Sequence, residues 1–329
     1  MPASPPPRAR RKLTARLLAL ACLLLFPPLR AWGWGCDGHQ AVALIAERHM
    51  TAHARRAADA LLQRAPIAPS LGRFCSSQGL DPLTDASTWA DDVRSVRPET
   101  GAWHYIDIPR EAPRSAVTAS CPAPEGCVVG ALQEQIAVLR SASDDPRTRA
   151  DALRFVIHLV ADLHQPLHCV TNNDMGGNCV PIDFFDTAPM EKDLLRESYS
   201  PNLHSIWDSA LIQRIRGNAT VALWAASLDH DFHARADGWE KEGINLSAWA
   251  WESHQLADSM AYGRLPVPDP VEKPQLVRSC ADDRHVSSRL LRLHERISEP
   301  YLNAVAPTVN QQIAQAGVRL AMLLNQVWP

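Results

Sequence analysis

Two histidine–aspartate pairs with the same four-residue spacing are the most chemically informative feature of the sequence. His158 and Asp162 occur in HLVADLHQPLH, and His204 and Asp208 occur in NLHSIWD. Residues four apart share one face of a helix, so each pair presents an imidazole and a carboxylate together. A third histidine, His168, follows the proline that ends the first helix. Neutral imidazole and carboxylate are favoured ligands of Zn²⁺, so the pattern predicts a zinc site.

Each of these features also has a simpler interpretation. A single His-x-x-x-Asp pair is usually an ion pair on the surface of a helix. Asp91, beside a tryptophan in STWADDVRS, and His104, in WHYIDIP, would each be structural if taken alone. Two pairs joined by a helix-breaking QPLH segment favour metal binding instead. Asp91 and His104 then become additional candidate ligands.

Helices must position these side chains. Asn202 can cap a helix through 203–215, and helical periodicity extends over 40–50, 130–142, 148–164, 221–232, 246–261 and 309–327. The segments WHYIDIP and CVPIDFF favour extended chain, and the second could form one side of a small hairpin. The sequence therefore predicts a mainly α fold, a single compact multi-helix domain with a small β-hairpin.

The first 33 residues are typical of a secretory signal peptide. Five basic residues precede an apolar run, 17–26, that is too short to span a membrane. Small residues at Ala31 and Gly33 predict cleavage before Trp34; cleavage after Ala31 and an uncleaved anchor are the alternatives. No later segment reaches the ~20 apolar residues of a membrane helix. We therefore expect a signal peptide at 1–33, one domain at 34–329, and a secreted or periplasmic protein without a membrane anchor.

The charge balance excludes one class of function. The leader carries six of the 33 basic residues and no acid, which leaves 27 basic against 36 acidic residues in the mature chain. A nonspecific nucleic-acid coat protein needs a basic face, so this class is disfavoured. An anionic substrate can still bind if metal ions supply positive charge locally.

Export favours disulfide bonds. Cys121 and Cys127 flank PAPEG, and Cys169 and Cys179 flank an Asn/Gly-rich loop, so both pairs are predicted to be local disulfides. One thiol of the mature chain must remain unpaired. The sequence leaves open the pairing of the other three cysteines, Cys36, Cys75 and Cys280.

At this point six ordered motifs carry a resemblance to a known family. They are WGCDGH, WADDVR, WHYIDIP, HLVADLHQPLH, GGN and NLHSIWD, and the likeness extends to WAWES and AGVRLAMLLN. Their order and spacing resemble the zinc-dependent single-strand-specific nucleases, the nuclease I type of fungi, plants and bacteria. The fold of that family is similar to bacterial zinc phospholipase C. The resemblance covers nearly the whole mature chain.

The resemblance implies three zinc ions, with a mature chain that begins at a tryptophan whose amino group and carbonyl oxygen bind metal. The spacing from Trp34 to His39 fits this role, whereas Trp32 would be too distant. An α-amino group with a pKa near ~8 is readily deprotonated by a metal. The implied ligand sets are Asp91, His104, His158 and Asp162 for the first zinc; His168, His204 and Asp208 for the second; and Trp34, His39 and a bridging Asp162 for the third.

The implied reaction is endonucleolytic hydrolysis of single-stranded RNA or DNA to 5′-phosphorylated products by a monomer, with 3′-nucleotides as further substrates. Asp91, Asp162 and Arg94 are the expected catalytic residues, and Arg94 also contacts the scissile phosphate. Tyr105 and Asp107 are expected to stack on and hydrogen-bond a nucleobase. Met175, just before GGN, is expected at the rim of the base site.

Two alternatives belong to other classes of protein. A zinc-dependent phospholipase C would share the metal core, but Arg94, Tyr105 and Asp107 suit a nucleic acid better. A secreted zinc-scavenging protein would hold metal without hydrolysis. Catalytic zinc sites keep a coordination position open, which a storage site does not need. The preference for RNA or DNA, and activity on cyclic dinucleotides, stay open.

Overall fold

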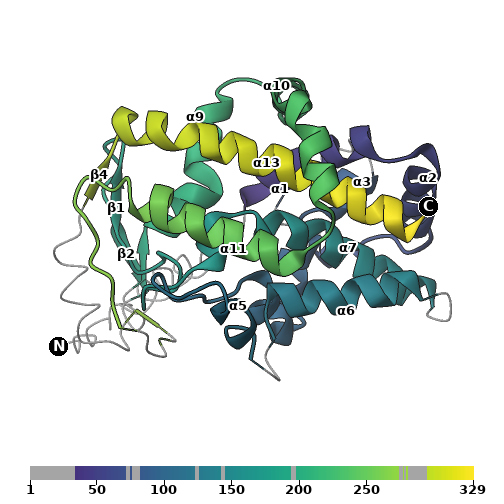
Figure 1. The fold of residues 1–329 in the computed structure, drawn as a ribbon, viewed down its shortest axis with the longest axis horizontal. Coiled ribbons are helices and arrows are strands. Elements are labelled where there is room, and N and C mark those ends of the chain that lie inside the picture. Colours follow the sequence, from purple (N-terminus) through teal and green to yellow (C-terminus); the bar gives the residue numbers. More distant parts are fainter. Residues whose placement is uncertain are drawn as a thin grey trace, which may run out of the picture. The chain divides into compact units, whose positions relative to one another are not determined.

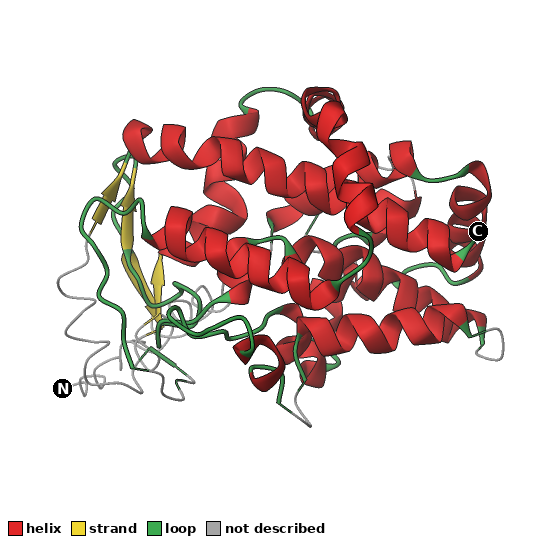
Figure 2. Ribbon diagram, viewed as in Figure 1, coloured by secondary structure: helices red, strands yellow, loops and turns green. Residues whose placement is uncertain are grey.

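The protein is described by a computed structural model that covers residues 34–71, 75, 82–122, 126–141, 145–193, 198–273, 277, 279–280 and 295–329. The expected signal peptide, 1–33, lies outside these residues. Helices make up most of the described chain, and the few strands gather at one end of the helical part (Figure 1, Figure 2). The prediction of a mainly α fold is confirmed.

The longer helices are α1 (Gly35–His49), α2 (Ala52–Arg64), α6 (Val128–Arg140), α7 (Pro146–Leu163), α10 (Val221–Glu242), α11 (Leu246–Leu256) and α13 (Glu299–Val327). The short helices are α3 (Pro82–Ala86), α4 (Trp89–Val93), α5 (Ala116–Ala119), α8 (Leu203–Ser205) and α9 (Leu211–Arg216). The described residues also include three 3₁₀ turns and two π-helical segments. They are η1 (Pro69–Leu71), η2 (Pro98–His104) and η3 (Pro166–Cys169), and η4 (Ile206–Ala210) and η5 (Ala257–Tyr262). Within the described residues, no helix is both long and apolar enough to cross a membrane.

The α7 helix begins and ends close to where its sequence predicts. The Asp145 carboxylate accepts hydrogen bonds of 2.9 and 3.1 Å from the backbone N–H groups two and three residues later, and Pro146 occupies the first helical position. Both features stabilise a helix N-terminus. The helix ends at Leu163, and Pro166 starts the η3 turn that carries His168.

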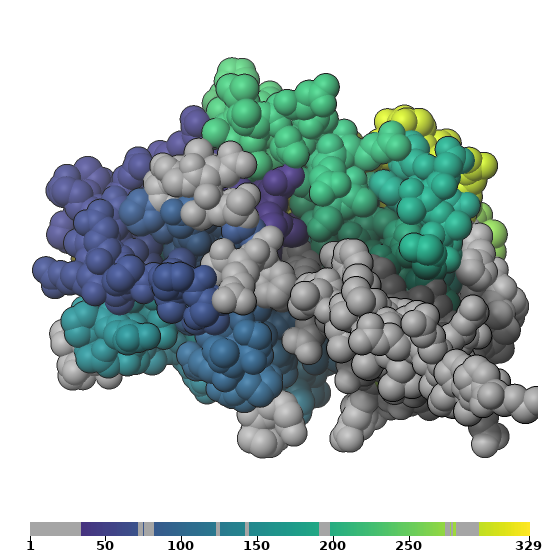
Figure 3. All heavy atoms as spheres, turned by 180° about the vertical axis from the view of Figure 1, so that it is seen from behind, coloured from purple at the N-terminus to yellow at the C-terminus, as the bar shows by residue number. Residues whose placement is uncertain are grey.

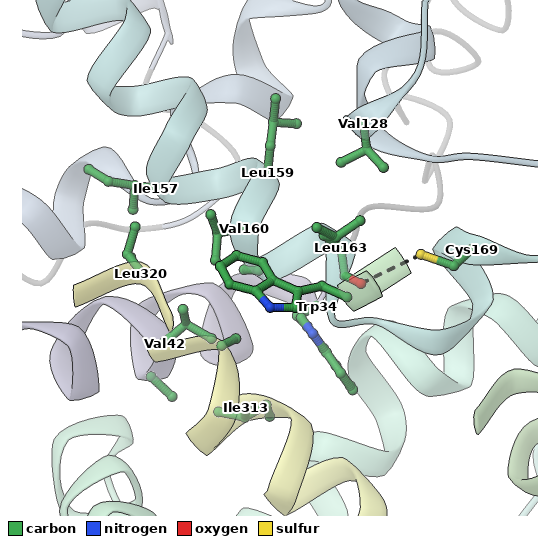
Figure 4. Packing of buried hydrophobic residues seen from close by; sticks show 14 of the residues in the cluster. Trp34, Val42, Val128, Ile157, Leu159, Val160, Leu163, Cys169, Ile313 and Leu320 are labelled. Carbon is green, nitrogen blue, oxygen red and sulfur yellow. Dashed lines mark hydrogen bonds between the residues drawn. The ribbon is translucent and has the colours of Figure 1, made fainter. Parts of the chain in front are cut away.

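The core lies where α1, α7 and α13 meet. The α13 helix packs against α1, α7 and α10; it crosses the front in Figure 1, and little of it is visible from behind (Figure 3). Gly317 allows the close approach of α13 to α1, because a Cβ there would lie 2.5 Å from Ile45 Cγ2. The fully buried Trp34 indole lies near Val160 and Leu163 in this core (Figure 4).

The strands pair differently from the sequence prediction. Strand β1 (Ile182–Phe184), within CVPIDFF, pairs in parallel with β4 (Glu295–Ile297), so it is not one side of a hairpin. The small antiparallel pair is instead β2 (Met190–Asp193) with β3 (Ser198–Ser200). Parallel pairing needs a long connection, which local sequence patterns do not reveal.

The disulfide predictions are half correct. The Cys121–Cys127 bond is confirmed, but the predicted Cys169–Cys179 bond is wrong, because Cys179 bonds to Cys280 instead. Cys169 is a buried free thiol whose Sγ lies 3.5 Å from the Leu163 carbonyl oxygen (Figure 4). The remaining disulfide, Cys36–Cys75, attaches the N-terminal end of α1 to the segment after α2.

Candidate metal centre

The α7 helix supplies the centre of a buried polar site. His158 and Asp162 are both fully buried, and His158 Nε2 lies 3.1 Å from Asp162 Oδ2. The Ser87 carbonyl accepts a 2.7 Å hydrogen bond from His158 Nδ1. Because a carbonyl can only accept, this contact puts the ring proton on Nδ1 and leaves Nε2 as a lone-pair donor facing the site.

Asp91 and His104 join His158 in the first group of potential metal ligands. The three ligand atoms lie within 4.8 Å of one another. Helix α4 contributes Asp91, and the end of η2 contributes His104, whose Nδ1 lies 3.7 Å from Asp91 Oδ1 and 2.9 Å from Asp162 Oδ2. The structure therefore brings together all four residues that the sequence assigns to the first site.

His168, His204 and Asp208 form a second group within the same 4.8 Å limit. His204 Nε2 lies 3.3 Å from Asp208 Oδ2, and His168 Nε2 lies 3.8 Å from Asp208 Oδ1. The predicted helix through 203–215 changes to a π-helical turn at Ile206–Ala210, which includes Asp208. Turns of this kind recur at functional sites.

Backbone carbonyls orient both histidines of this second group. The carbonyl of His104 accepts a hydrogen bond from His168 Nδ1, and that of Gly176 accepts one from His204 Nδ1, each at 2.7 Å. Gly176 has φ +61°, and a Cβ there would lie 2.5 Å from the Leu167 carbonyl oxygen, so only glycine fits.

The third group joins α1 to α7. His39, His158 and Asp162 offer ligand atoms within 4.8 Å of one another, and His39 Nε2 lies 3.3 Å from Asp162 Oδ1. The His39 and His158 rings stack with centroids 4.0 Å apart. His39 Nδ1 donates to the Trp34 carbonyl at 2.9 Å, so this carbonyl lies beside the group. Asp162 thus lies beside the first group through His104 and belongs to the third group with His39.

The buried polar atoms of the site fit a set of metal ligands. Within the described residues, five of its side-chain atoms are buried without a hydrogen-bond partner: His39 Nε2, His104 Nε2, Asp162 Oδ1, His168 Nε2 and Asp208 Oδ2. Buried polar atoms of native proteins are nearly always paired, so this concentration of atoms without a hydrogen bond favours a bound ligand. Imidazole nitrogen and carboxylate oxygen at this density match the donor set of zinc.

Burial keeps most of these imidazoles in the neutral form that binds metal. Burial lowers the pKa of His168 to about 3 and that of His204 to about 4. Burial also lowers the pKa of His104, although hydrogen bonding to Asp162 opposes it. For His158 the carboxylates of Asp162 and Asp91 outweigh burial and raise the pKa to about 9. A metal ion would take the place of that proton.

The residues expected to contact substrate lie beside the first group. Arg94 Nη1 lies 3.2 Å from Asp91 Oδ1, and the arginine side chain is 18% exposed. Tyr105, directly after His104, is 42% exposed, and burial followed by the charge of Asp107 raises the pKa of its hydroxyl. Asp107 is itself exposed.

Asp107 and Met175 are the other residues expected to contact a base. Desolvation by the surrounding protein and the nearby charge of Asp174 raise the pKa of Asp107 to about 6. Met175 is 38% exposed, has φ +56°, and directly precedes the glycine that holds His204. The role of Met175 at a base site stays a prediction.

Some supporting residues are not apparent from the sequence patterns. Gln165 donates from Nε2 to Asp208 Oδ1 at 2.5 Å and accepts from the backbone of Leu167 at 2.6 Å. It therefore connects the η3 turn to the second group. In the sequence, the only feature that could have indicated this role of Gln165 is its position just before Pro166. His164 points elsewhere, because Arg319 Nη1 donates to its Nε2 at 3.0 Å.

The fold is a helical domain with three adjoining buried groups of histidine and aspartate that could hold metal ions, and comparison with known proteins names the family. The model of the S1/P1 nuclease family matches residues 34–329. The chain belongs to the S1/P1 nuclease family and is a hydrolytic nuclease that acts on phosphodiester bonds. The predicted resemblance is confirmed.

Three characterised relatives show how far the similarity extends. The chain is 26% identical to Endonuclease 2 of Arabidopsis thaliana over 331 residues, which cover 95% of this chain and 96% of the relative. It is 26% identical to Nuclease P1 of Penicillium citrinum over 316 residues, covering 89% and 97%. It is 24% identical to Nuclease S1 of Aspergillus oryzae over 327 residues, covering 95% and 98%.

Proposed function

We propose that this nuclease is a zinc-dependent endonuclease that hydrolyses single-stranded RNA and DNA to 5′-phosphorylated products and also acts on 3′-nucleotides. The observation that carries the proposal is the position of Asp162, whose two oxygens face ligand candidates from α1, η2 and α7. A buried carboxylate with four histidines within 3.6 Å of its oxygens suits a metal cluster rather than an isolated ion.

The three groups would hold three zinc ions. The first would be bound by Asp91, His104, His158 and Asp162, the second by His168, His204 and Asp208, and the third by Trp34, His39 and Asp162. When bound, zinc supplies a Lewis acid that neutralises phosphate charge and makes water acidic enough to react near neutral pH. The neutral state of His168 and His204 favours binding, because neither has to lose a proton first.

Arg94 would bind the scissile phosphate. Its planar guanidinium can donate two parallel hydrogen bonds to phosphate oxygens, and its contact with Asp91 directs it toward the first group. Donors that face the developing charge stabilise the transition state. Departure of the 3′-oxygen leaves the phosphate on the 5′ side, and the same cleavage of a 3′-nucleotide releases inorganic phosphate.

Tyr105 and Asp107 would select unpaired bases. The exposed Tyr105 ring offers a stacking surface, and base–aromatic stacking is worth roughly 1–3 kcal/mol. The Asp107 carboxylate would accept a hydrogen bond from a base N–H group. A base inside a duplex is stacked and paired, so it cannot reach either side chain.

We also propose that the mature protein is a secreted monomer that begins at Trp34. The family match starts at this residue, and its buried indole lies at the beginning of α1 beside His39. Three disulfides support export, since such bonds persist in oxidising compartments. Cleavage of 1–33 would free the Trp34 amino group as a ligand.

The test compares three substrates at equal enzyme and zinc concentrations. We expect cleavage of single-stranded oligonucleotides to 5′-phosphorylated products, slow cleavage of the matching duplex, and little hydrolysis of phosphatidylcholine vesicles. Chelation should abolish cleavage, and zinc should restore it. Rapid phosphatidylcholine hydrolysis with inert oligonucleotides would establish the phospholipase alternative, and bound zinc without any hydrolysis would establish the storage alternative.

A further inference from the structure

A cavity of about 360 Å³ lies behind α4, on the side opposite the metal groups. Its wall includes Trp89 and Val93, which are four residues apart on this helix. Asp91 is two residues from each and therefore points to the opposite face, where the first metal group lies. One short helix thus separates the cavity from the candidate metal centre.

The cavity is strongly basic in an acidic protein. Four arginines line it, from the end of α2 (Arg64), the segment after α4 (Arg97) and the first half of α7 (Arg147 and Arg154), against one acid, Asp151. The formal balance of the lining is therefore about +3, whereas the whole chain has a formal net charge of −3. A concave basic surface of this kind concentrates anions.

Aromatic rings hold two of these arginines in place. The Arg154 guanidinium lies 5.4 Å from the centroid of the Trp89 ring, and that of Arg97 lies 5.4 Å from the Phe155 ring. Stacking on a ring leaves the in-plane N–H groups of an arginine free to donate. Arg154 donates from Nη1 to Asp151 Oδ1 at 2.9 Å and from Nη2 to the Ala65 carbonyl. Arg97 donates from Nε to Glu99 Oε1 at 3.4 Å, which leaves its terminal N–H groups for a ligand. Arg154 is only 3% exposed, and its buried Nε has no hydrogen-bond partner among the described residues.

Apolar residues form the rest of the lining. Ile67 and Leu71 contribute from the segment after α2, and Val93 and Val96 from α4 and the residues that follow it. Val96 is 63% exposed, so its side chain is accessible to a ligand in the cavity. A ligand that complements both the arginine side chains and the apolar side chains of the cavity needs an anionic group and a flat apolar part.

We propose that this cavity binds a second nucleotide, with its phosphate on the arginines and its base against Ile67 and Val96. The proposal goes beyond the proposed reaction, because binding there requires neither metal nor hydrolysis. The site would take a product mononucleotide or a nucleotide unit of a nucleic acid. The guanidinium groups of the four lining arginines would recognise the phosphate, and the aliphatic wall would recognise the base.

Calorimetric titration of the zinc-loaded enzyme with adenosine 5′-monophosphate tests the proposal, together with crystals soaked in the same nucleotide. We expect two binding events, one of which the Arg64→Gln/Arg147→Gln variant weakens about tenfold or more, because charged hydrogen bonds to phosphate are lost. Both substituted side chains are exposed, so the fold should survive. Arg114→Gln, also exposed but outside the cavity, is the matched control and should retain both events.

Adenosine lacks the phosphate and inorganic phosphate lacks the base, so these two ligands measure what each group contributes to binding in the cavity. Binding in the cavity should weaken strongly with either ligand, and cleavage of a dinucleotide should be the same in variant and wild type. A single binding event that is unchanged in the variant, or inorganic phosphate that binds as tightly as the nucleotide, would overturn the proposal. Failure of nuclease activity would contradict the proposed function but leave this titration informative.

Discussion

Asp162 Oδ2 lies 2.9 Å from His104 Nδ1, although 58 residues separate the two in the sequence. The other oxygen of Asp162 faces His39, from the first helix of the fold. Interaction with His158 and His168 and the hydrogen bond from His104 overcome the effect of burial, so the pKa of the Asp162 carboxyl is well below its usual value. The carboxylate is therefore ionised, as a metal ligand must be.

The position of Asp162 predicts a difference between two matched substitutions. Asp162→Asn should lose the metal of the first and third groups and nearly all activity, because an amide binds cations weakly. Asp208→Asn should lose only the metal of the second group. Metal analysis of both purified variants measures the difference. An Asp162→Asn protein with the zinc content of the wild type would refute the bridging assignment.

The start of the mature chain is expected to control the third group. One extra residue before Trp34 converts its amino group into an amide, which is a poor ligand, so the variant should bind less zinc and cleave slowly. Circular dichroism should show the same helical content. N-terminal sequencing of active secreted enzyme should give Trp34 first. Full activity in protein that begins at Trp32 would contradict this prediction.

The exposed Tyr105 ring is expected to contribute to substrate binding more than to turnover. Tyr105→Ala should raise KM for single-stranded oligonucleotides about tenfold, since stacking is worth roughly 1–3 kcal/mol. The value of kcat should change less, because stacking is present in both the ground and the transition state. Tyr105→Phe retains the ring and serves as the control. Equal KM values for all three proteins would exclude a stacking role.

Base recognition should depend on pH through Asp107. Its pKa is raised to about 6, so the carboxylate is charged above that pH and gains a proton as the pH falls through it. A protonated carboxyl accepts hydrogen bonds less well, so KM should rise between pH 7.5 and pH 5. Steady-state kinetics across this range should show the rise in the wild type and its loss in Asp107→Asn. The same pH profile in both proteins would rule out Asp107.

Gly176 is expected to be essential for the second group. An alanine there would adopt an unfavourable positive φ and place its Cβ 2.5 Å from the Leu167 carbonyl, which costs about 1–3 kcal/mol. The carbonyl that orients His204 would move, and zinc would be lost from this group. Thermal unfolding and metal analysis measure both effects. Gly101→Ala, where a Cβ meets nothing within 4 Å, should behave like the wild type.

The local parts of the site could be predicted from the sequence because they depend on short spacings. His158 and Asp162 share a helix face whatever the rest of the chain does, and Pro146 and Pro166 delimit that helix. Six ordered motifs then indicated the family, which the comparison confirms. The short spacing of Cys121 and Cys127 likewise identified a disulfide.

Only the tertiary structure decided which distant segments meet. The same argument from short spacing failed for Cys169, because η3 turns its thiol into the core while Cys179 meets Cys280, 101 residues away. Strand β1 pairs with β4 for the same reason, since long-range contacts depend on how helices pack and not on local periodicity. The arginines behind α4 come from three separate segments, so their common cavity exists only once α2, α4 and α7 have packed together.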